Sequence, residues 1–296
     1  MQIGLQLPSF KVSGGTAAIR PKLKEVVRAA EDGGFYSLWV MDHFYQIRGL
    51  FGEAYTDPML EAYTALGFLA GVSERLMLGA LVTGVIYRHP SVLLKMMNTL
   101  DIVSGGRGYL GIGAAWYEGE AEGFGVPYPD TKTRFEWLEE ALQMAHALWS
   151  SDETTFNGAH FNAPKLTNNP RPLSQPHPRI MIGGTGPNKT LRMVAQYADA
   201  CNIFMGGGVD AVRGSLDTLK GHCERLGRDY ATIEKTTLGT VYLAAGHETV
   251  EGTLEKLRQL SEIGVTHVIV NMPNVYEIAP LEIFARDIIP QAAQWS

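Results

Sequence analysis

The sequence has little cysteine, no excess of positive charge and no long apolar run, and each absence excludes a class of protein. Its two cysteines, Cys201 and Cys223, lack the spacing of a metal site or a disulfide framework. We therefore expect reduced, mostly buried thiols in a cytoplasmic protein. A net charge of −6, without a cluster of Lys and Arg, excludes nucleic acid as the main partner.

Signals for membranes, metals and common catalytic motifs are also missing. No apolar run approaches the length of a membrane span, and the N-terminus has no signal-like stretch, so we expect no membrane partner. The eight histidines show no metal-ligand spacing, which predicts no metal site. We find no phosphate-loop nucleotide motif and no serine nucleophile elbow. A barrel hydrolase or aldolase would need metal ligands or a Schiff-base lysine at a strand end, and neither is evident.

Strand and helix signals alternate along the 296 residues, a length that is usual for one α/β barrel. The predicted strands are Ile3–Leu7, Phe35–Met41, Leu76–Val82, Arg107–Ile112, Ile180–Ile182, Ala200–Phe204, Thr236–Leu243 and His267–Asn271. The predicted helices are Ala17–Asp32, one capped by Asp57 that opens at Pro58, Pro90–Val103, Thr131–Trp149, one ending near Tyr197, Asp210–Leu226, Val250–Ile263 and Pro280–Ile289. Eight strands, each followed by a helix, predict a (β/α)8 TIM barrel that forms a single domain over residues 1–296.

A polar, proline-rich segment from about 150 to 178 interrupts this alternation before the fifth strand. Glu153–Phe156 and His160–Asn162, on either side of Asn157-Gly158, predict a small hairpin. The prolines that follow indicate extended surface chain. We interpret the segment as an insertion in the barrel rather than as a domain boundary.

The glycines after the fifth strand form a candidate ligand site. An apolar strand, Ile180–Ile182, leads into Gly183, Gly184, Thr185 and Gly186, and then into a helix. Glycines let the backbone turn sharply with its N–H groups facing a ligand, and the helix directs the positive end of its dipole at the turn. This arrangement predicts an anion site, most often for phosphate, although a strand-to-helix turn without a ligand fits the same residues.

The residues just past each strand are the other site candidates, because TIM barrels carry their chemistry at the carboxyl ends of the strands. Asp42 and His43 follow the second strand, and we expect His43 to transfer a proton near neutral pH. A structural or helix-capping pair is the alternative. The next loop carries Phe44, Tyr45 and Phe51, which would shape a substrate pocket or, alternatively, an oligomer contact.

The third and fourth strands end in unusual runs. The apolar run through Leu81, Val82 and Thr83 overshoots an ordinary strand and meets Gly84, which predicts a bulge or strained backbone. Small residues after the fourth strand leave room for a flat ring to approach the backbone; they are Gly113, Ala114 and Ala115.

The sequence after these small residues excludes one cofactor motif. It is not a dinucleotide fingerprint, because Trp116 stands in place of the third glycine. The acidic run of Glu118, Glu120 and Glu122 is interpreted as a solvated loop face.

An ordered set of short motifs resembles the luciferase-like monooxygenase superfamily and, within it, the coenzyme F420-dependent oxidoreductases. The motifs are Gly34-Phe35 through Trp39 with Asp42-His43, Leu78-Gly79 through Arg88-His89-Pro90, Leu100-Asp101 through Ser104-Gly105-Gly106-Arg107, Gly111-Ile112-Gly113, Arg134-Phe135 with Leu138-Glu139-Glu140-Ala141-Leu142, and Ile182-Gly183-Gly184-Thr185-Gly186. They follow the family order across nearly the whole chain.

The resemblance implies a barrel with a flavin or 5-deazaflavin across its mouth. His43 would lie near the reactive face of the ring, and the phosphate would lie on Gly183–Gly186. A non-proline cis peptide at Leu81–Val82 would back the ring. With these, we assign further residues to the cofactor site, namely Asp42, Thr83, Gly113, Ala114, Ala115 and Tyr117, the last of which matches a cofactor-contacting tyrosine of bacterial luciferase. Trp116 is assigned to the substrate pocket with Phe44, Tyr45 and Phe51.

Two positions depart from the family pattern. Trp116 stands where F420-dependent glucose-6-phosphate dehydrogenases carry a glutamate acid, which argues against a sugar-phosphate substrate. Ala114 stands where bacterial luciferase has an arginine near the phosphate, which argues against an FMN enzyme of that type and leaves the glycine turn as the main anion site.

We therefore expect an F420-dependent oxidoreductase that transfers a hydride between the deazaflavin and a small organic substrate, apolar or conjugated. The alternatives are an FMN-dependent monooxygenase that uses reduced flavin, and a flavin-binding protein without turnover. We also expect a homodimer.

Overall fold

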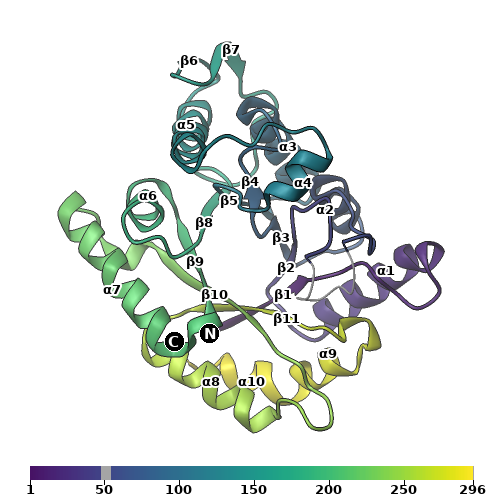
Figure 1. Cartoon of the computed structure of the whole chain (residues 1–296). Coiled ribbons are helices and arrows are strands. Elements are labelled where there is room, and N and C mark those ends of the chain that lie inside the picture. The colour runs from purple at the N-terminus through teal and green to yellow at the C-terminus, as the bar shows by residue number, and fades with distance from the viewer. Residues whose placement is uncertain (48–54, 296) are drawn as a thin grey trace.

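The computed structural model describes residues 1–47 and 55–295, in which parallel strands form a barrel surrounded by helices (Figure 1). The strands pair in the order β3-β2-β1-β11-β10-β9-β8-β5, and pairing of β3 with β5 closes the sheet. They are β1 (Gln2–Leu7), β2 (Ser37–Val40), β3 (Met77–Ala80), β5 (Gly108–Gly113), β8 (Arg179–Gly183), β9 (Ala200–Phe204), β10 (Glu234–Thr240) and β11 (His267–Asn271). The predicted (β/α)8 barrel is confirmed.

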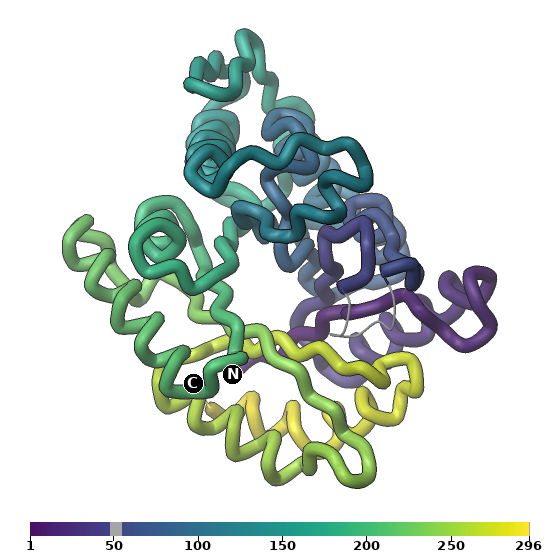
Figure 2. The backbone as a smooth tube through the Cα atoms, in the orientation of Figure 1, coloured from purple at the N-terminus to yellow at the C-terminus, as the bar shows by residue number. Residues whose placement is uncertain are grey.

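The helices form the outer layer, and the chain path in Figure 2 shows them following one another around the barrel. They are α1 (Thr16–Asp32), α2 (Ala62–Ala70), α3 (Pro90–Val103), the short α4 (Glu118–Gly123), α5 (Thr131–Trp149), α6 (Thr190–Tyr197), α7 (Gly208–Leu226), α8 (Val250–Glu262), α9 (Ala279–Ile283) and α10 (Ile289–Ala292), the last two joined by a π-helical turn. The first and last strands, β1 and β11, lie side by side in parallel register.

Apolar residues fill two layers. Trp39, Tyr109, Met181 and Ile269 belong to a separate cluster of fully buried side chains contributed by β2, β5, β8 and β11. Such a cluster is typical of the packed interior of a barrel. A larger cluster joins the outer faces of the strands to the helices, each of which buries one apolar side.

A polar network joins the amino-terminal ends of four strands. The Ser37 hydroxyl lies 2.9 Å from His267 Nε2, and His267 Nδ1 lies 2.9 Å from the Glu234 carboxylate. Tyr109 donates to the other Glu234 oxygen at 2.8 Å. Burial raises the pKa of Glu234, but the bonds from His267 and Tyr109 outweigh it and leave this pKa below its ordinary value.

The third strand is interrupted where the sequence predicted a bulge. It ends at Ala80 rather than at Val82, and the chain pairs with β5 again as β4 (Thr83–Gly84). The peptide between Leu81 and Val82 is cis, as the resemblance implied.

Several predicted boundaries are wrong, among them the strand expected over Thr236–Leu243, which is β10 at Glu234–Thr240, and two others with a clear physical reason. The helix expected to open at Pro58 starts at Ala62, because the Glu61 carboxylate caps it by accepting from the N–H groups of Tyr63 and Thr64 at 3.2 and 2.7 Å. The hairpin in the insertion pairs β6 (Glu153–Asn157) with β7 (Asn162–Thr167), so its second strand starts later than predicted and runs through Pro164. A strand in a two-stranded sheet has a free edge and tolerates proline.

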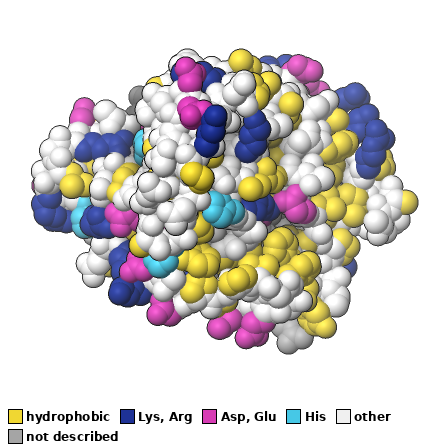
Figure 3. Space-filling model, turned by 90° about the horizontal axis from the view of Figure 1, so that it is seen from above, with side chains coloured by type: hydrophobic (Ala, Val, Ile, Leu, Met, Phe, Trp, Pro, Cys, Tyr) yellow, Lys and Arg dark blue, Asp and Glu magenta, His cyan; other side chains and the backbone are white. Residues whose placement is uncertain are grey.

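The surface on the side of this hairpin mixes charged side chains of both signs with apolar patches (Figure 3). Both Cys201 and Cys223 are free and buried. Among the described residues, no helix is long and apolar enough to cross a membrane. Within the same ranges, no group of three or more His, Cys, Asp or Glu side chains could hold a metal ion.

Candidate active site

A cleft of about 410 Å³ opens at the carboxyl ends of the barrel strands. Its volume lies within the usual range for small-molecule sites. The residues that line it are Asp42, His43, Leu81, Val82, Thr83, Gly84, Tyr87, Gly113, Ala114, Ala115, Trp116, Thr131, Arg134, Phe135, Leu138, Gly183, Gly184, Thr190, Asn202, Phe204 and Leu238. The residues that line the cleft therefore come from both halves of the barrel.

Most residues predicted for the site line this cleft, and some lie beside it. Those that line it are Asp42, His43, Leu81, Val82, Thr83, Gly113, Ala114, Ala115, Trp116, Gly183 and Gly184. Those outside its lining are Phe44, Tyr45, Tyr117, Thr185 and Gly186. Phe51 lies outside the described residues.

His43 is held by a carboxylate that the sequence did not single out. Its Nδ1 lies 2.6 Å from Glu120 Oε1. The other Glu120 oxygen accepts from the backbone N–H groups of Phe44 at 2.7 Å and Tyr45 at 3.2 Å. An ionised carboxylate can only accept, so Nδ1 of a neutral imidazole carries the proton and Nε2 stays available in the cleft.

Glu120 also accepts from the Tyr87 hydroxyl, so four donors converge on one carboxylate. Burial raises the pKa of Glu120, yet the hydrogen bonds from His43, Tyr87 and Phe44 outweigh it and keep this pKa below its ordinary value. The pKa of Tyr87 is raised by burial and by the Glu120 charge. These directions agree with an ionised Glu120 at neutral pH.

The interpretation of Glu118, Glu120 and Glu122 as a solvated loop face is wrong for the central residue. The segment forms α4, and its one turn places Glu120 inward with 0% exposure, whereas Glu118 and Glu122 are exposed. Nothing in the sequence distinguishes the three glutamates, because burial here depends on where α4 lies over the end of β2.

Asp42 does not pair with His43, although the two are adjacent. Its carboxylate accepts from both terminal nitrogens of Arg88, at 2.7 and 2.9 Å, and from the Gly84 N–H at 3.2 Å. Arg88 also bonds Glu61, the cap of α2. The Asp42 side chain thus ties the end of β2 to the segment after β4, and its bidentate ion pair leaves little uncompensated charge in the cleft.

The aromatic residues after β2 form a cluster beside the cleft rather than its wall. The Phe44 ring packs 4.7 Å from those of both Tyr87 and Phe124, and Tyr45 packs 5.4 Å from Phe124. These rings surround the backbone whose N–H groups bond Glu120. Their assignment to the substrate pocket is not supported by the cleft lining, because their packing is directed toward α4.

Trp116 lies at the cleft entrance. Its ring is 61% exposed, stacks on Tyr117 at 5.3 Å between centroids, and meets the His43 ring edge-on at 5.5 Å. The Tyr117 ring lies 6.0 Å from the same imidazole, and because the Trp116 and Tyr117 rings stack on each other, both lie on one side of it. The two aromatic side chains therefore restrict where His43 can move.

The glycine turn connects β8 to α6 across Gly184–Lys189. The Gly184 N–H donates to the Asn202 carbonyl at 3.0 Å, so this group is not available for a phosphate. No acceptor within the described residues accounts for the N–H groups of Thr185 and Gly186. Helix α6 starts at Thr190 with no side-chain cap, and in its first turn the Leu191 N–H donates to the Gly186 carbonyl at 3.0 Å, so only some of the first N–H groups remain as donors. The donors that remain for an anion therefore lie nearer to α6 than the Gly184 N–H does.

The chain is similar to a known protein family and to several characterised proteins. The family model described as luciferase-like monooxygenase matches residues 1–278. An F420-dependent glucose-6-phosphate dehydrogenase of Kineococcus radiotolerans is 31% identical over 217 residues, which are 73% of this chain and 62% of that protein. An FMNH(2)-dependent dimethylsulfone monooxygenase of Pseudomonas putida is 25% identical over 244 residues, 77% of this chain and 64% of that protein.

The chain thus spans somewhat less than two thirds of the length of these curated relatives. Among solved structures, an F420-dependent secondary alcohol dehydrogenase in complex with an F420-acetone adduct superposes with a TM-score of 0.80. It is 19% identical, and the match covers 98% of both chains, so this likeness supports the fold. With its barrel, its cleft and a family match from residue 1 to residue 278, the chain belongs to the luciferase-like monooxygenase family.

Proposed function

We propose that the protein is an F420-dependent oxidoreductase that transfers a hydride between the deazaflavin and a small organic substrate. The observation that carries the proposal is that His43 and the glycine turn after β8 line one cleft, although they lie far apart in the sequence. The similarity to an F420-dependent dehydrogenase supports this choice of cofactor. The exposed Trp116 and Phe204 rings at the cleft support an apolar or conjugated substrate.

The cleft fits a flat ring and an anionic tail. Val82 lies between Gly113 and Gly183, and a Cβ on either glycine would approach its methyl groups to 3.0 Å. Because both positions are glycines, neither contributes a side chain that covers the Val82 methyl groups, and this part of the cleft is apolar. Arg134 lines the same cleft and has a buried Nε without a partner among the described residues. The residues thus suit a cofactor that combines a flat ring with a phosphate.

When bound, F420 would supply the hydride chemistry, and the protein would supply orientation and proton transfer. His43 would exchange a proton with the substrate through Nε2, because Glu120 occupies Nδ1. Glu120 would fix the ring orientation and stabilise the imidazolium form. Trp116 and Tyr117 would keep water away from one side of the imidazole.

The decisive experiment separates chemistry from binding. His43→Ala should lower single-turnover hydride transfer roughly 10²–10⁴-fold, the usual contribution of a general acid or base. The F420 dissociation constant should change far less, because the glycine turn lies elsewhere in the cleft. Normal transfer in a cofactor-saturated variant would remove His43 from the mechanism.

An FMN-dependent monooxygenase is the second candidate, favoured by the similarity to the dimethylsulfone enzyme. Parallel titrations with F420 and FMN decide between them, since the two cofactors differ in absorption and fluorescence. Tighter binding of FMN, with oxygen consumption upon reduction, would replace the first proposal. Binding without any turnover across a substrate screen would support a flavin-binding protein.

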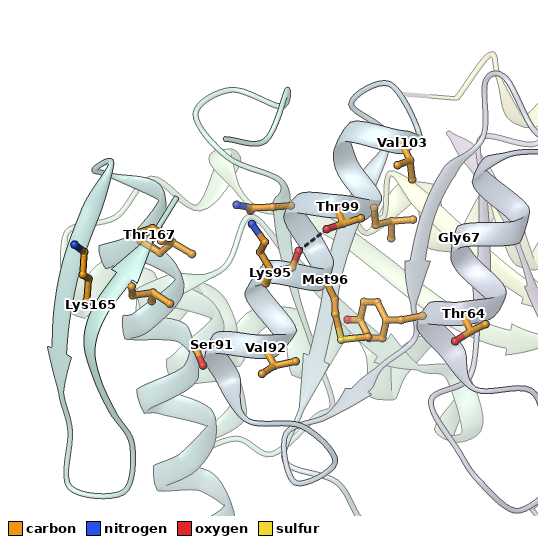
Figure 4. A pocket seen from close by; sticks show the side chains of 15 residues that line it. Thr64, Gly67, Ser91, Val92, Lys95, Met96, Thr99, Val103, Lys165 and Thr167 are labelled. Carbon is orange, nitrogen blue, oxygen red and sulfur yellow. Dashed lines mark hydrogen bonds between the residues drawn. The ribbon is translucent and has the colours of Figure 1, made fainter. Parts of the chain in front are cut away.

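We also infer a homodimer formed through α2 and α3. A groove of about 510 Å³ runs along these helices and β7 (Figure 4). Val92 and Val103 on α3 are 54% and 56% exposed. Gly67 on α2 is exposed, and a Cβ there would meet no described atom within 4 Å. A glycine inside a helix costs about 1 kcal/mol relative to alanine, and close approach of a second chain would explain it.

Light scattering tests the oligomeric state. The wild type should elute as a dimer, and Val92→Glu combined with Val103→Glu should produce a folded monomer. A monomeric wild type would overturn this inference. The free, buried Cys201 and Cys223 support a cytoplasmic location, where thiols stay reduced.

A further inference from the structure

A second cavity, of about 620 Å³, lies outside the barrel wall, where β10 and β11 face the neighbouring helices α7 and α8 (Figure 1). Its floor is apolar. Val268 and Val270 reach it from β11, while Ile269 between them belongs to the cluster inside the barrel. Leu257 and Leu260 reach it from α8, and these two leucines and two valines are at most 3% exposed. The cavity therefore lies in the layer between strands and helices, which barrels normally fill with packed side chains.

Glycines keep this cavity open. Gly206 and Gly208 line it from the segment after β9, Gly239 from β10 and Gly252 from α8. Outside the helix backbone, a Cβ on Gly252 would meet only the Thr249 hydroxyl oxygen, at 3.4 Å, and a Cβ on Gly208 would meet no described atom within 4 Å. A glycine in a helix is less favourable than alanine, so the fold alone does not explain Gly252. Space for a ligand does explain it.

The polar groups around the cavity are either already bonded or at its outer edge. Thr253 is 4% exposed, and its hydroxyl donates to the Thr249 carbonyl at 2.8 Å. Glu255 and Lys256 are exposed on α8, and Lys256 lies 3.4 Å from the Glu248 carboxylate. A cavity with an apolar floor and charges only at its edge suits an uncharged, apolar ligand.

Phe204, at the end of β9, connects this cavity to the cleft that contains His43. Among the described residues it is the one that lines both spaces. Adjacent residues of β10 face opposite sides of the barrel wall, so Leu238 lines the cleft and Gly239 the cavity. The Phe204 ring is 54% exposed and lies over Gly206, where an added Cβ would approach the ring to 2.6 Å. The barrel rim at β9 is thus a single aromatic ring next to small residues.

We propose that this cavity binds an apolar arm of the substrate, which crosses the rim at Phe204 while the reacting carbon lies beside His43 in the cleft. The proposal rests on the proposed function, because it places one substrate in both spaces. It narrows that substrate to a molecule with an uncharged aliphatic or alicyclic arm. Phe204 determines which arms cross the rim and takes no part in hydride or proton transfer.

The binding test needs neither cofactor nor turnover. Wild type, Gly252→Phe and Gly214→Phe are titrated with the neutral fluorescent dye Nile red, and secondary alcohols from butanol to dodecanol then compete with the dye. Gly252→Phe places a ring in the cavity. Gly214→Phe is the matched control, because Gly214 is an exposed glycine of α7 outside the lining, and a Cβ there meets no described atom within 4 Å. Folding of each variant is checked by circular dichroism and elution volume.

We expect the affinity of the wild type for the alcohols to rise roughly two- to fourfold with each added methylene, because each one buries more apolar surface. Gly252→Phe should remove this rise for the longer alcohols and weaken Nile red binding about tenfold or more, whereas Gly214→Phe should bind both as the wild type does. Val209→Glu, which adds a charge to the same lining, should act in the same direction as Gly252→Phe. Equal affinities in Gly252→Phe and the wild type would overturn the proposal.

A kinetic arm keeps this proposal separable from the proposed function. The alcohols serve as hydride donors to F420 with an arm of adjustable length. Gly252→Phe should raise KM for the longer alcohols about tenfold or more, with kcat changed less than about twofold, which is the pattern of lost substrate binding. Phe204→Trp should shift the preference toward shorter alcohols.

The two proposals fail in different ways. If the protein does not bind F420, the proposed function fails, and the competition between Nile red and the alcohols still decides whether the cavity takes an apolar arm. If alcohols reduce F420 but KM depends neither on chain length nor on residue 252, the proposed function stands and the cavity is not part of the substrate site.

Discussion

Replacing Glu120 by glutamine should reverse the proton arrangement on His43. The carboxylate accepts from two backbone N–H groups on one oxygen and from His43 and Tyr87 on the other. A glutamine has one acceptor oxygen, so its NH₂ must face one of these pairs. If the NH₂ group faced the backbone, it would point at the N–H groups of Phe44 and Tyr45, which are also donors. The amide should therefore face His43 and make Nδ1 an acceptor, which places the proton on Nε2.

The magnitude follows from this change. A His43 whose Nε2 already carries a proton cannot accept one from a substrate, so single-turnover transfer in the oxidising direction should fall about 10²–10⁴-fold. Losing the charge on a carboxylate with four donors should also lower the free energy of unfolding by about 1–3 kcal/mol. Cofactor affinity should change little.

Nitrogen NMR of histidine-labelled protein measures the tautomer directly, with His43→Ala used to assign the signal. Glu122→Gln is the matched control, since the same chemical change occurs two residues away on an exposed side chain. Tyr87→Phe removes one donor from Glu120 without touching the imidazole, and it should reduce the rate less than about tenfold. An unchanged tautomer and transfer rate in Glu120→Gln would refute the reasoning, whatever the cofactor proves to be.

Two further predictions concern the glycine turn and acid stability. Gly184→Asp should weaken cofactor binding by about 2 kcal/mol or more, because it adds a negative charge near the phosphate; Gly184→Ala controls for strain, since residue 184 has φ +121° and its Cβ would lie 3.3 Å from Thr190. Wild-type affinity in folded Gly184→Asp would exclude the turn from the site. Glu234 has a lowered pKa, so its stabilising contribution is present above the ordinary value of 4.5 and is lost as the pH falls through its folded pKa. Glu234→Gln should therefore be less stable than wild type in urea at pH 7, and the difference should shrink below pH 4.5; a constant difference would contradict this.

The barrel could be predicted from the sequence because its signals are local. Pro90 opens α3, an N-cap and an apolar period define α5, and short apolar runs mark β9 and β11 at their observed bounds. The start of α2 could not be predicted in this way. Its cap, Glu61, also bonds Arg88, a residue from a later segment of the chain.

The candidate site shows the same difference between features that local sequence predicts and features that depend on tertiary contacts. Residues that follow strands, such as His43 and Gly183, were found because barrel topology alone brings them to one cleft. Two buried charged residues were missed because they lie on helices, and only tertiary packing places these helices against the cleft. Glu120 on α4 and Arg134 on α5 look like ordinary surface charges until tertiary packing removes them from solvent.

The pairing of β1 with β11 has a consequence for how the chain reaches its fold. Residues 2–6 pair with residues 267–271, so the barrel cannot close before nearly the whole chain is available. Until then, β1 and β10 each present an edge with unpaired backbone groups, which invites pairing with another molecule. Chains truncated before β11 should therefore aggregate rather than form a smaller soluble barrel. Contacts of such large sequence separation also predict slow folding, with closure as a late event.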